Sequence, residues 1–199
     1  MKRALLINLL AIAFLATAVL AAAEPPPAAA AKGKPALVVM DIQKAFMPYM
    51  DCEETEGAMP MINATIELFR KHGLPVITVY HTDPAHGPQP GTESFEFADS
   101  VGIQDSDPKV VKTHASAFNQ TELDRILREQ GADTVFLAGL SAVGCVLATY
   151  FDADRLDYRV FMVRGGLISH KAELTESVEE MTGAVGYEAI TYMLAGATD

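Results

Sequence analysis

The chain has 199 residues, of which half are hydrophobic, and it carries 26 acidic against 15 basic side chains. A net charge of −11 excludes the broad basic surface that nucleic acids or anionic membranes need for binding. The same acidity is typical of a solvated surface that keeps a protein soluble, so it says nothing about a substrate.

The first 23 residues have the pattern of a secretory signal peptide. Lys2 and Arg3 precede an apolar run from Ala4 to Leu20, which leads into three further alanines. The run is short for a membrane span and no basic stop-transfer flank follows it, so we expect cleavage after Ala23. The mature protein is then periplasmic or extracellular with no membrane attachment. An uncleaved N-terminal anchor is the alternative.

Residues 24–34 consist of Pro, Ala, Gly and Lys after one Glu, with no side chain to bury, which indicates a flexible tether. Residues 35–199 remain, and a segment of this size builds one hydrophobic core. No internal repeat divides it. We therefore expect one domain.

Within that domain, apolar runs alternate with amphipathic stretches, which is the βαβ pattern of a parallel sheet. Near-continuous apolar strands such as Val135–Ala138 indicate burial on both faces. The sequence therefore predicts a three-layer α/β fold: a doubly wound, mostly parallel, six-stranded sheet with helices on both faces. The predicted strands are Ala36–Met40, Val76–Tyr80, Val110–Val111, Thr134–Leu140, Arg159–Val163 and Glu188–Met193, and the predicted helices are Met61–His72, Thr121–Gln130, Val146–Leu156 and Leu174–Thr182.

Three reactive side chains follow predicted strands, where ligands bind in doubly wound sheets. Asp41 and Lys112 each end a strand, and Cys145 lies at a strand-to-helix turn. A thiol at a helix N-terminus gains from the helix dipole, which favours the thiolate. A carboxylate can take the thiol proton, and an ammonium can stabilise the thiolate. Each residue alone has a common structural explanation, but together they indicate a cysteine nucleophile.

Three ordered motifs resemble the isochorismatase-like cysteine hydrolases, which include nicotinamidases and N-carbamoylsarcosine amidases. The resemblance covers nearly the whole domain and implies a cysteine-dependent hydrolase of a small-molecule amide or related C–N bond. The motifs are Val38–Gln43 through Phe46, then Lys112 with Ser116–Phe118 and Thr121–Leu123, then Gly139–Val146.

The resemblance implies a catalytic role for each reactive residue. Asp41 is the general base, Lys112 the neighbouring cation, and Cys145 the nucleophile that forms a thioester-type acyl intermediate. A cis peptide bond is expected at Leu140–Ser141, so that the N–H groups of Ser141 and Cys145 form an oxyanion hole.

The resemblance also implies how the substrate is held. Phe46 and Phe118 are expected to contact a small molecule, and Gln43 to support the site. No cofactor is expected, and a homodimer or larger homo-oligomer is the expected assembly, with neighbouring subunits closing the pocket.

Nicotinamidase-like members add a metal site, made from an Asp and several His after the second strand. Here Tyr80–His86 contains those residue types without the Asp-x-His order and without a third histidine nearby. We therefore expect no metal at His81, Asp83 and His86, because His and Asp in such loops are usually solvated or form turns. Arg164–Gly165 is a second departure, since many relatives carry Asp-Ala there.

Three alternatives stay open. The chain could cleave a vinyl ether, as isochorismatase does, or be a non-catalytic ligand-binding or redox protein on the same fold. Because the compartment is expected to be oxidising, Cys52 and Cys145 could also form a disulfide that switches the enzyme off; otherwise Cys52 is a free loop thiol. The substrate depends on residues 47–57 and 82–108, whose conformations the sequence does not give.

Overall fold

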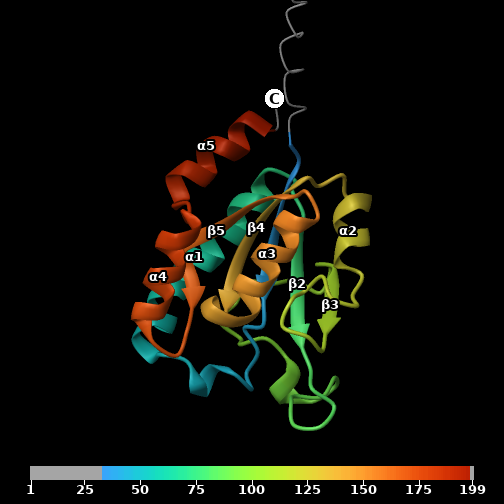
Figure 1. Ribbon diagram of the computed structural model, residues 1–199, viewed down its shortest axis with the longest axis vertical. Helices are drawn as coiled ribbons and strands as arrows, with labels where there is room; N and C mark the ends of the chain where they lie inside the picture. Colours follow the sequence, from blue (N-terminus) through green and yellow to red (C-terminus); the bar gives the residue numbers. More distant parts are fainter. Residues whose placement is uncertain (1–32, 198–199) are drawn as a thin grey trace, which may run out of the picture. The chain divides into compact units, whose positions relative to one another are not determined.

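A computed structural model describes residues 33–197, in which five parallel strands form one sheet between helices (Figure 1). The strand order is β3-β2-β1-β4-β5, which confirms the predicted α/β class, with five strands in place of six. The predicted signal peptide and most of the tether lie outside the described residues. The strands are β1 Pro35–Met40, β2 Val76–His81, β3 Lys109–Lys112, β4 Thr134–Leu140 and β5 Arg159–Ile168. The helices are α1 Cys52–Lys71, α2 Leu123–Glu129, α3 Leu147–Arg155, α4 Ala172–Thr182 and α5 Tyr187–Ala197, with the short helical segments η1 Met47–Tyr49, η2 Glu93–Phe95 and η3 Ala142–Val146.

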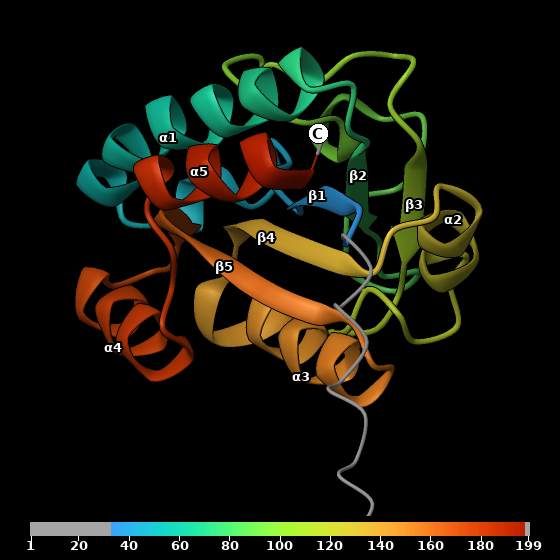
Figure 2. The same cartoon turned by 90° about the horizontal axis from the view of Figure 1, so that it is seen from above.

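Both faces of the sheet are buried, because side chains alternate along each strand. In β1, Leu37 and Val39 belong to the hydrophobic cluster beneath α1 and α5. Ala36, Val38 and Met40 belong to the cluster on the opposite face, beneath α2 and α3. Figure 2 shows α1 and α5 on one side of the sheet and α3 on the other. Burying a large apolar side chain contributes roughly 1.5–3 kcal/mol, so these two layers stabilise the sheet that carries the site.

The predicted sixth strand is wrong. Glu188–Met193 lies inside a helix, α5, which spans Tyr187–Ala197. Ile190 and Leu194 are four residues apart and fully buried, so they share one helix face in the same hydrophobic cluster as α1. The short apolar run has a helical period that its β-branched residues concealed.

Helix α1 begins nine residues before the predicted Met61–His72 helix. Asp51 caps it by accepting the Glu54 N–H at 2.9 Å, and Pro60 lies inside it. Proline lacks the N–H that would bond four residues back. That carbonyl belongs to Glu56, an exposed residue, so water can take the place of the lost donor. Residues 52–57, part of one of the two segments expected to determine the substrate, are therefore helical.

Strand β5 runs from Arg159 to Ile168, beyond the predicted end at Val163, and its register against β4 shifts near the middle. The irregular part contains Arg164–Gly165. Arg164 Nη1 lies 3.5 Å from Glu179 Oε2, and the Gly165 N–H donates to Glu179 Oε1 at 2.6 Å. Glu179 of α4 therefore holds Arg164–Gly165, the two residues that differ from the family pattern.

The strand order places the switch point between β1 and β4. The chain passes from β1 outward to β2 and β3, then returns to β4 on the other side of β1. Loops after neighbouring strands diverge at such a point and leave room for a ligand at the carboxyl edge. All five strands have their carboxyl ends at the lower edge in Figure 1.

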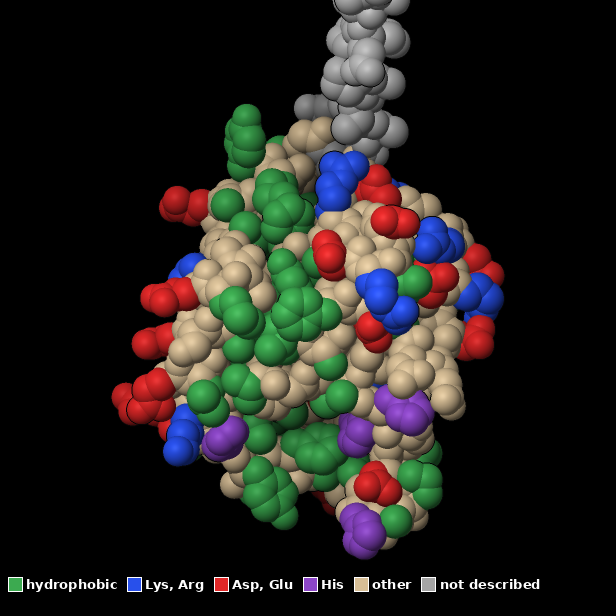
Figure 3. Space-filling model, in the orientation of Figure 1, with side chains coloured by type: hydrophobic (Ala, Val, Ile, Leu, Met, Phe, Trp, Pro, Cys, Tyr) green, Lys and Arg blue, Asp and Glu red, His purple; other side chains and the backbone are tan. Residues whose placement is uncertain are grey.

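Hydrophobic side chains gather along the face that α3 and α4 turn toward the viewer in Figure 3. Large exposed side chains on these helices and the preceding η3 include Val143, Phe151 and Met181. Within residues 33–197, no helix is both long and apolar enough to cross a membrane. The expected homo-oligomer stays a prediction.

Candidate active site

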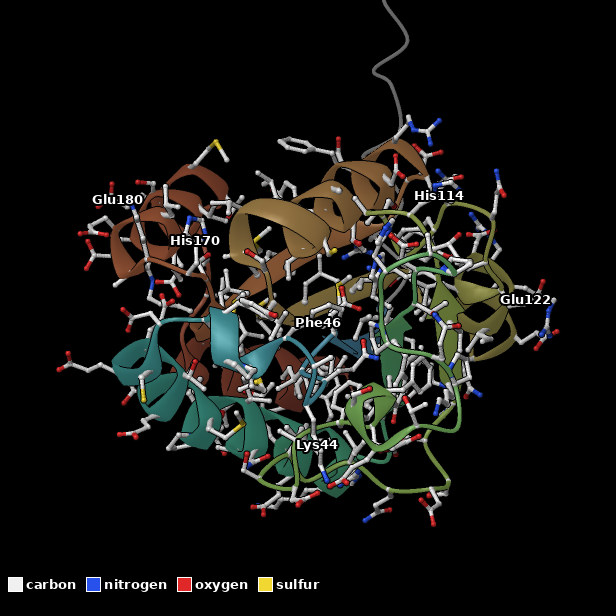
Figure 4. The ribbon with its side chains drawn as sticks, turned by 90° about the horizontal axis from the view of Figure 1, so that it is seen from below. Lys44, Phe46, His114, Glu122, His170 and Glu180 are labelled. Atoms are coloured by element: carbon white, nitrogen blue, oxygen red, sulfur yellow. The ribbon has the colours of Figure 1, made fainter. Side chains whose placement is uncertain are left out.

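Three strand ends bring together the side chains predicted to react. Asp41 follows β1, Lys112 is the last residue of β3, and Cys145 lies in η3 after β4. The Lys112 ammonium is 2.8 Å from Asp41 Oδ2 and donates to Cys145 Sγ at 3.1 Å. Its side chain is fully buried, so solvent does not screen these contacts. Figure 4 looks onto this edge of the sheet, with Phe46 near the centre of the view.

The backbone of the sheet holds Asp41 in place. Its φ is 57°, and its N–H donates to Val79 O at 2.9 Å. Strand β4 comes close because Gly139 has no side chain; a Cβ there would lie 2.2 Å from Met40 O. Apart from the ion pair with Lys112, no hydrogen bond of ordinary geometry reaches the Asp41 carboxylate from the described residues. The carboxylate can therefore accept a proton.

The surroundings of Cys145 favour the protonated thiol. Burial, followed by the negative charge of Asp41, raises the pKa of Cys145 to about 11, although Lys112 opposes both effects. Burial also raises the pKa of the Asp41 carboxyl, against the attraction of Lys112. Cys145 lies in η3, which leads directly into α3 at Leu147, so it is at the predicted strand-to-helix turn. Burial and Asp41 oppose the thiolate there, whereas Lys112 favours it.

The turn that carries Cys145 starts with a cis peptide bond between Leu140 and Ser141, at the position that the family resemblance implied. Ser141 O accepts the N–H groups of Gly144 at 2.9 Å and Val146 at 3.2 Å, which closes the turn. No hydrogen bond from the Ser141 N–H is present within residues 33–197. This N–H is available to an oxyanion beside the thiol.

His81 also contacts the site, although the sequence indicated it only as part of a metal loop. It pairs with Lys112 in the β2–β3 register, and Lys112 Nζ lies 3.1 Å from His81 Nδ1. Lys112 Nζ also donates to His114 O at 3.3 Å. The signal that could have found His81 is its position as the last residue of the strand between those of Asp41 and Lys112.

Gln43 connects the ends of β1 and β2. Its buried side chain accepts the His81 N–H at 2.7 Å and donates to His81 O at 3.0 Å and Phe95 O at 2.8 Å. These bonds use both N–H groups of the amide and one acceptor site of its oxygen, which fits the expected supporting role. The Phe46 ring lies 6.0 Å from the His81 ring, on the side of the site that Figure 4 shows.

Phe118 contacts Tyr158 and a surface cavity. Its ring centre is 5.7 Å from that of Tyr158, which precedes β5, and it lines a surface cavity with Asp152 and Arg155 near the end of α3. Phe118 and Cys145 both pack against the hydrophobic cluster beneath α2 and α3, and a contact of Phe118 with substrate stays a prediction.

Both cysteines are free thiols in the structure. Cys52 is the exposed first residue of α1 and lies 3.7 Å from Glu56 Oε1, to which it donates. The charge of Glu56 is the main cause that raises the Cys52 pKa. A disulfide between Cys52 and Cys145 stays an open alternative.

The loop after β2 does not fit a metal. Lys112 occupies His81 Nδ1, and its positive charge opposes a second cation there. Asp83 Oδ1 accepts the Ala85 N–H at 2.8 Å, and His86 is exposed. Across the described residues, no three or more His, Cys, Asp or Glu side chains are grouped to hold a metal ion.

The chain also matches the model of a known family. The Isochorismatase domain model matches residues 35–189. The chain belongs to the isochorismatase family. This confirms the resemblance seen in the motifs, and it shows that residues 35–189 have the hydrolase fold of this family.

Relatives of this isochorismatase-family chain include amide hydrolases. YwoC, an isochorismatase family protein of Bacillus subtilis, is 28% identical over 159 residues, covering 72% of this chain and 82% of YwoC. Maleamate amidohydrolase of Pseudomonas putida is 41% identical over 74 residues, 37% of this chain and 35% of that enzyme. The solved N-carbamoylsarcosine amidase from Thermoplasma acidophilum is 31% identical, covers 77% of this chain and 95% of its own, and has a TM-score of 0.67.

Proposed function

We propose that this hydrolase cleaves an amide or related C–N bond of a small molecule, with Cys145 as nucleophile. The observation that carries the proposal is one buried ammonium, Lys112, which contacts both the Asp41 carboxylate at 2.8 Å and the Cys145 thiol at 3.1 Å. An ion pair alone would not need a thiol as third partner. The two relatives named as amide hydrolases favour a C–N bond over a vinyl ether.

Acylation begins with the neutral thiol. As Cys145 Sγ attacks the substrate carbonyl carbon, its proton passes to the Asp41 carboxylate, and Lys112 stabilises the developing thiolate. The carbonyl oxygen becomes an oxyanion, which in this proposal accepts hydrogen bonds from the N–H groups of Ser141 and Cys145. Asp41 then gives its proton to the leaving nitrogen, the C–N bond breaks, and a thioester remains on Cys145.

Deacylation reverses these roles. Asp41 takes a proton from a water molecule, whose oxygen attacks the thioester carbon. The second tetrahedral intermediate expels the sulfur, which recovers a proton from Asp41. The product is a carboxylic acid, and no cofactor is required.

The proposal also includes the cellular compartment and the oligomeric state. We propose export to the periplasm or the extracellular space after cleavage of residues 1–23, and a homodimer or larger homo-oligomer. The protein binds a small-molecule substrate in this proposal, and it binds neither nucleic acid nor a membrane surface.

The test is ammonia release from a panel of small amides and N-carbamoyl compounds, including maleamate and N-carbamoylsarcosine, under reducing conditions. We expect turnover by the wild type and loss of at least about 1,000-fold in Cys145→Ser, with Cys52→Ser as the matched control at wild-type rate. Intact mass under acid quench should show the acyl group on Cys145. Equal rates for Cys145→Ser and wild type would sink the assignment, and pyruvate release from isochorismate would instead support vinyl ether cleavage.

A further inference from the structure

His81 lies between the catalytic ammonium and an aromatic ring. Its Nδ1 is 3.1 Å from Lys112 Nζ, and its ring centre is 6.0 Å from that of Phe46. Lys112 Nζ is also 3.1 Å from Cys145 Sγ, so Nδ1 and the sulfur are no further apart than twice that distance. The imidazole is therefore close to the nucleophile.

The contact with Lys112 determines where the imidazole carries its proton. An ammonium has hydrogen-bond donors and no acceptor, so Nδ1 must present its lone pair to it. A neutral ring then carries its hydrogen on Nε2. The groups that act on the ring support the neutral form: burial and then the charge of Lys112 lower the pKa of His81 to about 4, Asp83 opposes this, and His114 adds to it.

The Nε2–H has no partner among residues 33–197. Among the hydrogen bonds of the described residues, the His81 side chain takes part only through Nδ1. The side chain is half-buried, and Nε2 is not among the buried nitrogen and oxygen atoms that lack a partner. Nε2 therefore keeps some solvent-accessible surface, so it can be reached from outside the protein.

We propose that His81 determines substrate specificity by donating a hydrogen bond from Nε2–H to an oxygen of the substrate beside the scissile C–N bond. The preferred substrate is then an amide with a second carbonyl or a carboxylate near the reacting carbonyl. This inference rests on the proposed function of Cys145. A site built around such a donor disfavours analogues that lack the acceptor, and one neutral hydrogen bond corresponds to roughly tenfold in rate.

Two isosteric substitutions separate the two ring nitrogens. His81→Asn places an amide group where Nδ1 lies and has nothing at the Nε2 position. His81→Gln places an amide nitrogen near the Nε2 position. His86→Asn is the matched control, because His86 is an exposed histidine of the same loop.

The probes are maleamate and (Z)-but-2-enamide, which differ in having a carboxylate or a methyl group beside the amide. We expect the wild type, His86→Asn and His81→Gln to prefer maleamate by about tenfold or more in kcat/KM. His81→Asn should lose most of that preference. A purely structural role for His81 would lower both rates together and leave the ratio unchanged, which would overturn the proposal.

Nitrogen-15 NMR of the wild-type histidine side chains tests the same idea without any variant being active. We expect His81 to stay neutral as the Nε2–H tautomer from pH 5.5 to 8, with an Nε2 shift when maleate is added. The proposal would be contradicted by an Nδ1–H tautomer or by a His81 titration midpoint near pH 6.5. It would also be contradicted if the Nε2 resonance shifted with zinc and not with maleate. Turnover that persists in Cys145→Ser overturns the proposed function instead, whereas an unchanged ratio with an inactive Cys145→Ser overturns only this inference.

Discussion

The Lys112 ammonium has more acceptors than protons. It lies within 3.3 Å of Asp41 Oδ2, Cys145 Sγ, His81 Nδ1 and His114 O, but an ammonium has three N–H bonds. The donors must therefore be shared among the four groups. A change in the charge of any one of them alters the others, which makes the site sensitive to single substitutions.

Lys112→Met should destabilise the protein by about 3–5 kcal/mol at neutral pH, because it leaves the buried Asp41 carboxylate without a counter-charge. The difference in the free energy of unfolding between the variant and the wild type should shrink as pH falls. Burial raises the folded-state pKa of Asp41, so the folded form favours the neutral carboxyl, and stability is lost as pH rises through that pKa. Guanidinium unfolding between pH 4 and 8 measures this.

Lys44→Met is the control for this experiment. Lys44 pairs with Glu93 and Asp99, both of which are largely exposed. Its removal should cost less than about 1 kcal/mol at every pH. Equal costs for the two lysine variants would show that the Lys112 ion pair is not shielded.

Asp41→Asn should abolish turnover and yet make the thiol easier to alkylate. The carboxylate is one cause of the Cys145 pKa of about 11, and thiolate is the form that reacts. In the wild type, the iodoacetamide rate should rise about tenfold per pH unit from pH 7 to 10. In Asp41→Asn the same curve should move to lower pH.

Hydrolysis by Asp41→Asn should nevertheless fall by about 100- to 10,000-fold, because no general base remains. Cys145 is followed by mass spectrometry of the alkylated peptide, with Cys52 in the same digest as an internal reference. A wild-type curve that levels off near pH 8.5, or one that Asp41→Asn leaves in place, would show that the thiol is not controlled by Asp41.

Among the elements, those with a strong hydrophobic pattern were predictable. The buried strands β1 and β4 and their carboxyl ends follow from continuous apolar runs, and with them Asp41 and Cys145. Helix α5 was not predictable from the sequence. Its short apolar run, in which Ile190 and Leu194 are buried, has a composition that also occurs in short strands. Only the packing of this segment against α1 distinguishes a helix from a strand.

The contacts of His81 and the pKa of Cys145 also lay beyond the sequence. The first depends on the register that sets His81 beside Lys112. The second depends on burial outweighing the neighbouring ammonium. Neither register nor burial can be read from motif spacing alone, so the motifs gave the identities of the reactive groups without their protonation states.

Gly139→Ala should separate β4 from β1 and damage the site at a distance. Gly139 has φ +117°, and a Cβ would lie 2.2 Å from Met40 O, which directly precedes Asp41. We expect a loss of at least about 3 kcal/mol, since strain and a backbone clash add. Gly73→Ala is the control, with φ +64° and nothing within 4 Å of the added Cβ.

The cost of Gly73→Ala should be about 1 kcal/mol from backbone strain alone. Thermal and denaturant unfolding of both variants measures the difference. Insoluble Gly139→Ala beside soluble Gly73→Ala agrees with the expectation, whereas equal stabilities would mean that the two strands can move apart without cost.

At the scale of the whole molecule, export and a cysteine nucleophile have to be compatible. If residues 1–23 are removed after Ala23, the mature chain begins at Glu24 and enters an oxidising space with two thiols. Disulfide exchange requires a thiolate as attacking group. Burial raises the Cys145 pKa to about 11, and Glu56 raises that of Cys52, so both thiols resist this attack near neutral pH.

We therefore expect the exported protein to retain two titratable thiols and full activity without reductant. Thiol titration of the denatured protein, isolated from the periplasmic fraction with no reducing agent present, measures this directly, and the mass of the same sample locates the N-terminus. Cys52→Ser should respond to oxidised glutathione as the wild type does. If untreated protein instead has no titratable thiol and gains activity with reductant, while Cys52→Ser does not, the two cysteines form a disulfide and the redox switch is correct. The raised pKa of Cys145 would then not be enough to protect this thiol from disulfide formation.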